Sequence, residues 1–160
     1  MGQKLFLKII NPQIKGEATD DRHKDEIEVL SWFWEAAFTI LDHAGGGAGG
    51  GKPTKQNLSI IHYIDKATPV LMHSCLSGQK IQQAILTAKN TGTPNTEFFK
   101  MTIDDIRITS VTPRGEAGAE RMTETVTLIF NKITEEYIYT TSTGHPDPPI
   151  KSEWDFRTNR

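Results

Sequence analysis

The segment with the most potential for chemistry is the glycine-rich stretch at residues 45–53. Its GGAGGGK sequence, residues 46–52, satisfies the first seven positions of a phosphate-binding P-loop, but Pro53 stands where the motif needs a Ser or Thr to hold Mg²⁺. The same glycines fit a G-x-G-x-x-G dinucleotide motif. Both motifs require a helix directly after the glycines, whereas residues 58–64 have the pattern of a strand. We therefore predict a flexible interaction loop in place of a nucleotide site, made of Gly45, Gly46, Gly47, Gly49, Gly50, Gly51 and Lys52.

Metal binding and nucleophilic catalysis have equally little support. None of the five histidines stands at a metal-ligand spacing from another histidine or from the single cysteine, Cys75. The acidic pairs at residues 20–21 and 25–26 lack the pattern of a calcium loop and indicate solvated or interface charges. Cys75 lies on an apolar helical stripe, which is typical of a core thiol. We expect no catalytic residue, no metal and no cofactor.

Length and charge narrow the class of protein further. The chain of 160 residues fits one domain, residues 1–160, and its 18 basic and 20 acidic residues give a net charge of −2. That balance argues against a nucleic-acid partner held by a basic surface. The apolar run at residues 5–10 is too short for a signal peptide, and no stretch could insert into a membrane. We expect a protein that folds in the cytosol and has no internal disulfide.

The elements that must position any functional side chain are mainly strands. Strands are expected at residues 4–10, 27–36, 58–64, 80–89, 98–111, 125–140 and 151–159. One short helix is expected from Pro69 to Ser77, with Thr68 as N-cap and Gly78 as left-handed terminator. The apolar parity reverses near residues 29–30 and again within residues 98–111, which indicates bulges. Many strands with bulges predict a curved sheet that closes into a barrel.

Several segments together resemble a known family. Residues 16–32, GEATDDRHKDEIEVLSW, closely resemble the N-terminal signature of the haemolysin-coregulated proteins (Hcp), the tube proteins of bacterial type VI secretion. Residues 63–69, YIDKATP, resemble the second signature of that family. Residues 86–89, 124–130 and 154–159 fit its remaining strands, so the resemblance runs in order from residue 4 to residue 159.

The resemblance implies a fold and a set of partners. The fold would be mainly β: a single-domain β-barrel of two curved antiparallel sheets, with one short α-helix and an extended glycine-rich loop. Six copies would close into a ring, and rings would stack into a tube that meets sheath and spike-tip proteins. Small secreted effectors would travel in the lumen. The protein would be cytoplasmic before firing and then secreted without a signal peptide.

The resemblance also directs attention to particular surfaces. Residues 29–34 carry apolar side chains on both faces of their strand, more than a small barrel core can hide, so a partner surface is expected there. Phe33 stands where relatives often have a small polar residue, so the resemblance does not extend to the cargo preference of the family. The loop around Lys52 would reach an adjacent ring. The candidates for subunit-interface or lumen contacts are Ser31, Trp32, Phe33, Trp34, Asp20, Asp21, His23, Trp154 and Arg157.

Two other functions stay open at this point. One is a secreted hydrolase built on the same barrel, which would need a convergent titratable pocket. The other is a phage tail-tube subunit, which shares the barrel architecture. The signatures at residues 20–29 and 63–69 favour the secretion family.

Overall fold

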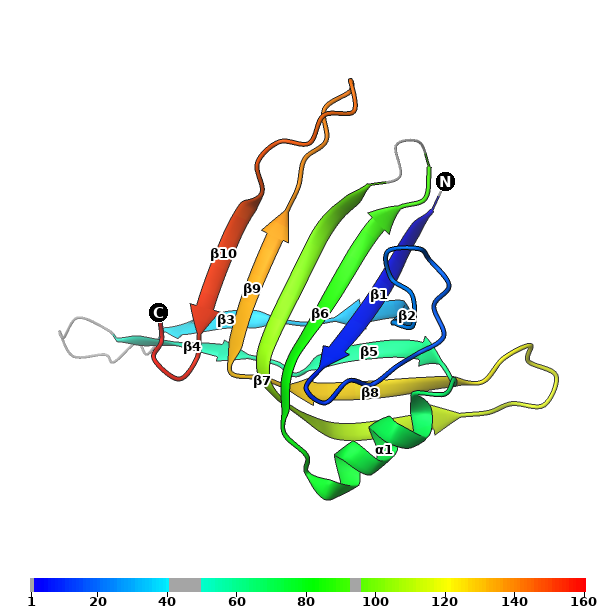
Figure 1. The fold of residues 1–160 in the computed structure, drawn as a ribbon. Helices are drawn as coiled ribbons and strands as arrows, with labels where there is room; N and C mark the ends of the chain where they lie inside the picture. The colour runs from blue at the N-terminus through cyan, green and yellow to red at the C-terminus, as the bar shows by residue number, and fades with distance from the viewer. Residues whose placement is uncertain (1, 41–49, 93–95) are drawn as a thin grey trace.

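The computed structural model describes residues 2–40, 50–92 and 96–160, and the fold that they form is mainly β (Figure 1). The prediction of a β fold with a single helix is confirmed for these residues. Their elements are β1 (Gln3–Ile10), β2 (Ile27–Phe33), β3 (Ala36–Ile40), β4 (Gly51–Lys55), β5 (Leu58–Tyr63), α1 (Thr68–Ser77), β6 (Ile81–Asn90), β7 (Glu97–Arg114), β8 (Thr123–Ile129), β9 (Lys132–Tyr137) and β10 (Ile150–Asp155).

Six strands close into an antiparallel barrel in the order β7–β6–β1–β2–β5–β8, and the pairing of β7 with β8 completes the circle. The long strand β7 makes this closure possible. Its first half lies between β6 and β9, and its second half turns to pair with β8. The turn coincides with Asp105, whose φ of 57° is left-handed, and with a register shift between Ile108 and Ser110. β9 and β10 extend the sheet beyond the barrel (Figure 1).

The predicted parity reversal in β2 is confirmed as a bulge. The pairing of β2 with β5 shifts register between Val29 and Ser31. Before the shift, Ile27 and Val29 are buried; after it, Trp32 and Trp34 pack against the core. One extra residue therefore reverses which side chains point inward.

The helix is confirmed, but its predicted N-cap is wrong. α1 begins at Thr68, and the capping position is Ala67, which has no side chain that could bond the first turn. The Thr68 hydroxyl instead accepts a hydrogen bond from the Asp65 amide at 3.2 Å, and the Asp65 carboxylate accepts one from the Ala67 amide at 2.8 Å. These two bonds fix the turn that enters the helix. Gly78 ends the helix with φ 63°, as predicted.

Two further expectations about the elements need correction. Residues 125–140 form two strands, β8 and β9, because the Asn131 amide donates to the Asp104 carbonyl at 3.1 Å and turns the chain between them. The predicted loop is shorter than expected, since Gly51 pairs with Ile40 and Lys52 pairs with Thr39 in the hairpin β3–β4. Gly50 precedes this strand, while Gly45, Gly46, Gly47 and Gly49 lie outside the described residues.

We call residues 36–40 and 50–55 the arm. A backbone hydrogen bond of 2.8 Å from Gln56 to Glu35 joins the arm to the barrel hairpin of β2 and β5. The arm extends away from the barrel in Figure 1, close to the C-terminus. Every residue of β3 is exposed, including Phe38. The ring of Phe38 lies over Gly51, so that a side chain at residue 51 would push this exposed ring aside.

Candidate assembly surfaces

The outward side of β2, β5, β8 and the second half of β7 carries small hydroxyl side chains. Residues paired across strands share a face, and two rows of such pairs cross this sheet. All eight side chains point away from the core, and none is charged. We call this set the hydroxyl face: Ser31, Ile61, Thr125 and Thr112 in one row, and Phe33, Ser59, Thr127 and Ser110 in the other.

The outward side of β9, β10 and the first half of β7 is very different. It carries two rows of alternating charge, which we call the charged face: Lys100, Glu136 and Lys151 in one row, and Asp104, Lys132 and Asp155 in the other. Lys151 lies 3.6 Å from Glu136, so the opposite charges pair across the strands. The two rows of the hydroxyl face are therefore uncharged, with Arg107 and Arg114 of β7 in the rows that flank them, whereas the charged face alternates lysine with carboxylate.

The loop that precedes β2 holds three of the predicted candidates, and two of them make internal bonds. The Lys89 ammonium donates a hydrogen bond to Asp20, whose pKa it holds below the usual value. Both ring nitrogens of His23 lie 2.9 Å from a carboxylate oxygen, one on Glu26 and one on Glu97. Burial raises the pKa of the Glu26 carboxyl.

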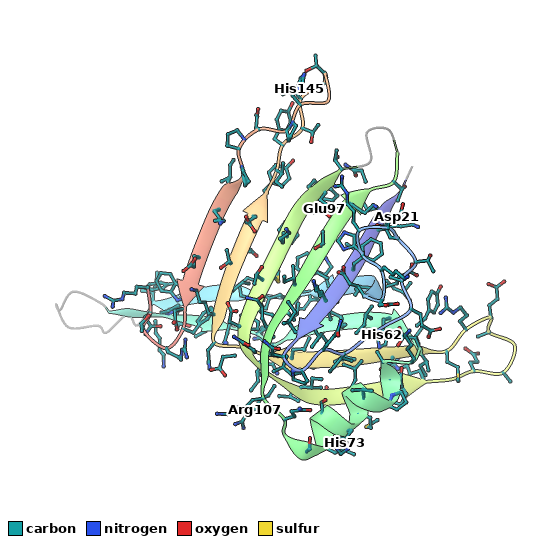
Figure 2. All side chains as sticks on the ribbon, viewed as in Figure 1. Asp21, His62, His73, Glu97, Arg107 and His145 are labelled. Carbon is teal, nitrogen blue, oxygen red and sulfur yellow. The ribbon has the colours of Figure 1, made fainter. Side chains whose placement is uncertain are left out.

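The same loop covers the barrel wall. The His23 ring stacks on Phe6 with centroids 4.4 Å apart. Gly16 is needed because a side chain there would collide with the backbone of Glu26 and Ile27. Asp21 stays exposed, and Figure 2 places it near Glu97 at the end of the barrel away from α1. Residues 16–26 of the first family signature thus form a loop closure, and Asp21 is the only fully exposed residue among the three candidates in this loop.

A buried hydrogen-bonded pair was missed by sequence reasoning. His62 Nε2 lies 2.8 Å from Glu124 Oε1, and both side chains are completely buried (Figure 2). The other ring nitrogen of His62 lies 3.9 Å from Asp65, and burial raises the pKa of that carboxyl. A signal existed: His62 and Glu124 continue the inward parity of the apolar residues in β5 and β8. Polar residues at inward positions on paired strands indicate a buried pair.

Trp34, Trp154 and Arg157 gather at the base of the arm. The two tryptophans line a cavity of about 300 Å³, together with Pro53 of the arm and Phe156. Their indole nitrogens are buried and find no hydrogen-bond partner among the described residues. Arg157 is exposed and pairs with Asp155 at 3.1 Å. The nine candidates therefore occupy four separate places, since only Ser31 and Phe33 lie on the hydroxyl face and Trp32 packs inward against Phe99 at 5.6 Å.

The described part of the chain offers little for catalysis. It contains no group of three or more His, Cys, Asp or Glu side chains placed to hold a metal ion. Cys75 is half-buried on α1. Within the same residues, no helix has both the length and the apolar character needed to cross a membrane. The hydroxyl face, the charged face and the arm are therefore the features whose function remains to be assigned.

Comparison with known proteins identifies the family. The profile described as "Type VI secretion system effector, Hcp" matches residues 6–137. The protein Hcp1 of Pseudomonas aeruginosa is 39% identical over 161 residues, covering 99% of this chain and 98% of that protein. A crystal structure of Hcp1 from Salmonella typhimurium has a TM-score of 0.82 at 38% identity, covering 100% of this chain and 99% of that chain. A structure described as that of a type six secretion system protein, at 24% identity, shares the fold with a TM-score of 0.90 and covers 99% of each chain. The predicted resemblance is confirmed, and the chain belongs to the Hcp family, the tube proteins of the bacterial type VI secretion system.

Proposed function

We propose that six copies of this chain close into a ring and that rings stack into the inner tube expelled by the type VI sheath. Small effector proteins travel in the lumen, and spike-tip proteins meet the end of the tube. The chain acts as a structural subunit and not as an enzyme. It waits in the cytoplasm and is secreted when the sheath contracts. The observation that carries this proposal, beyond family membership, is the chemical contrast between the hydroxyl face and the charged face.

The hydroxyl face is the candidate for the lumen wall. Serine and threonine side chains carry no charge, so a protein moving past Ser59 or Thr127 meets no counter-ion that would hold it and no like charge that would repel it. The charged face suits the outside of the tube, where sheath proteins approach. An uncharged inner surface and a charged outer surface suit the two sides of a tube wall, which meet different partners.

The arm is the candidate for contact between rings. Phe38 is 62% exposed and Ile40 is 72% exposed, which leaves adjacent apolar side chains in water at the end of a projecting hairpin. A second copy in the next ring would cover them. Gly50, Gly51 and Lys52 belong to the distal half of the arm and would take part in this contact.

Light scattering and electron microscopy of the purified protein test the proposal. We expect a mass of about six subunits and closed rings, since a ring built from one heterologous contact closes on itself. Phe38→Asp should leave the rings intact and prevent their stacking, and it should abolish secretion from a type VI-competent bacterium. A monomer mass for the unaltered protein at micromolar concentration would refute the ring.

A further inference from the structure

We propose that an acidic loop at one end of the barrel enters a basic pocket at the opposite end of a second copy of this chain in the next ring. The inference rests on the proposed tube function and names a contact between rings. The two parts lie at the two ends of one hairpin, which β8 forms with the second half of β7. Arg107 pairs with Ile129 at the base of this hairpin, and Arg114 pairs with Thr123 at its tip. At about 3.3 Å per residue, the strand from 107 to 114 separates the two ends by roughly 20 Å.

The basic pocket is a cavity of about 500 Å³ at the base of the hairpin. Its charged lining residues are Lys55, Lys80, Arg107 and Asp105. Asp105 already has partners, because it accepts a hydrogen bond from Asn131 and lies 3.7 Å from Arg157. None of the three cations forms an ion pair within the described part of the chain. The basic pocket therefore holds positive charge that a carboxylate from another chain could neutralise.

The surroundings of Lys55 favour such a carboxylate. Its ammonium group lies over two aromatic rings, 4.2 Å from the centroid of Phe130 and 4.6 Å from that of Phe156. Burial lowers the pKa of Lys55, because these rings replace water and bring no counter-charge. An incoming carboxylate would supply the missing charge and stabilise the ammonium form.

The acidic loop, residues 115–120, joins β7 to β8 and has the sequence GEAGAE. Both of its carboxylates, Glu116 and Glu120, are exposed, and neither forms an ion pair among the residues that the structure describes. The other four residues are glycine or alanine, so the backbone can enter a cavity without bulky side chains. Arg121, which follows the loop, is held over the Tyr63 ring at 3.9 Å. The acidic loop therefore presents negative charge alone.

The positions of the two parts indicate a copy in the next ring as the partner. The acidic loop projects beyond one end of the barrel, and the arm projects from the other (Figure 1). Lys55 is the last residue of β4, so the basic pocket lies at the base of the arm. An arm that reaches the next ring thus brings the basic pocket toward an acidic loop there. The contact joins two different surfaces and repeats along an open stack. Six copies would make it six times at each junction, so that weak ion pairs act together.

Charge reversal tests this contact. Glu116→Lys with Glu120→Lys reverses the acidic loop, and Lys80→Glu with Arg107→Glu reverses the basic pocket. Each should lower the fraction of purified rings found in stacks by electron microscopy at low salt at least fivefold. The chain with all four substitutions should recover at least half of the wild-type fraction, because opposite charges face each other again. Salt at about 1 M, where the Debye length is about 3 Å, should separate wild-type stacks.

Lys100→Glu with Lys151→Glu is the matched control, because it changes the net charge as much as the reversal of the basic pocket but lies on the charged face. Its stacked fraction should stay within twofold of the wild type. A carbodiimide joins a carboxylate to a lysine amine in direct contact with it. In stacked wild-type rings, this reagent should cross-link Lys80 to Glu116 or Glu120.

Four results would overturn the inference and leave the ring in place: normal stacking by both reversed variants, no recovery with all four substitutions, an equal loss in the control, or wild-type rings that stay single at low salt. Loss of the ring itself in a reversed variant would place the contact between neighbours within one ring, and it would also overturn the inference. A monomeric wild type would instead overturn the proposed function.

Discussion

We predict that the bond between Lys89 and Asp20 contributes strongly to the stability of the fold, because it connects the loop of the first family signature to the barrel. The side chains are 6% and 15% exposed, so both charges are nearly withdrawn from water. Removing one partner of a buried pair leaves an uncompensated charge and costs about 3–5 kcal/mol. Asp20 keeps a hydrogen bond from the Arg22 amide at 3.1 Å and some contact with water, and so we expect Lys89→Met to cost about 3 kcal/mol.

Thermal unfolding measured by circular dichroism is the assay. In a domain of this size each kcal/mol changes Tm by about 2–4 °C, so Lys89→Met should lower Tm by roughly 10 °C at neutral pH. All samples must be compared at one protein concentration, because ring formation also stabilises the fold. The matched control is Lys151→Met, which removes a 59% exposed lysine lying 3.6 Å from Glu136. An exposed pair contributes about 0–1 kcal/mol, so this variant should melt within about 3 °C of the wild type.

Two more measurements separate the loss of the Lys89 charge from the loss of its packing contacts. Lys89→Met combined with Asp20→Asn should recover part of the lost Tm, because no unpaired charge is then left. The pKa of Asp20 is lowered mainly by its bond to Lys89, so the stabilisation is present above the ordinary aspartate pKa and is lost as the pH falls through the lower folded-state pKa. The Tm difference should therefore persist from about pH 5 to pH 8 and shrink below about pH 4. A Lys89→Met variant that melts like Lys151→Met would refute the reasoning.

Three further predictions concern other parts of the chain. Glu124→Ala should lower the free energy of unfolding in urea by about 1–3 kcal/mol, because it leaves the buried His62 ring without its hydrogen-bond partner. Glu124→Gln, which keeps an acceptor for His62, should cost less, and equal losses would contradict the role of the hydrogen bond. Replacing residues 44–50 with a short turn should leave ring mass and Tm nearly unchanged but abolish tube assembly and secretion, and normal secretion by this variant would argue against the stacking role. Calorimetry should detect no saturable binding of Mg²⁺-ATP, because Pro53 lies in β4 opposite Phe38 and offers no hydroxyl for the metal ion.

The barrel was predictable because its signals are local in sequence. The pattern of apolar residues located β1, β5 and β6 within a few residues. The reversal of parity in β2 located its bulge, and the reversal within β7 located the bend at Asp105. Gly78 marked the end of α1 because glycine adopts the left-handed conformation of a helix terminus without steric cost. These features depend on residues that are neighbours in the chain.

The arm and the buried pairs were not predictable in the same way. Gly51 and Lys52 looked like loop residues, yet they form a strand because β3 pairs with them and Phe38 covers the glycine. Lys89 and Asp20 are 69 residues apart in the chain, and nothing in the sequence of either segment indicates the other. The candidates at residues 20–23 were chosen from a family signature, and the structure places most of that signature in a loop closure. Contacts between distant segments thus account for what the sequence missed.

The bulge in β2 decides which of its aromatic side chains pack in the core and which one faces outward. Without the extra residue between Val29 and Ser31, the parity of the strand would continue, and Phe33 would turn toward the core while Trp32 and Trp34 faced outward. With it, the two indoles pack on Phe99 and Phe130, at 5.6 Å and 5.9 Å, and stabilise the barrel. Phe33 is left outward among hydroxyl groups, where its 62% exposure means that a substitution removes little from the core. The register that fixes the fold therefore frees this one position to vary, because a change there leaves the packing of Trp32 and Trp34 intact.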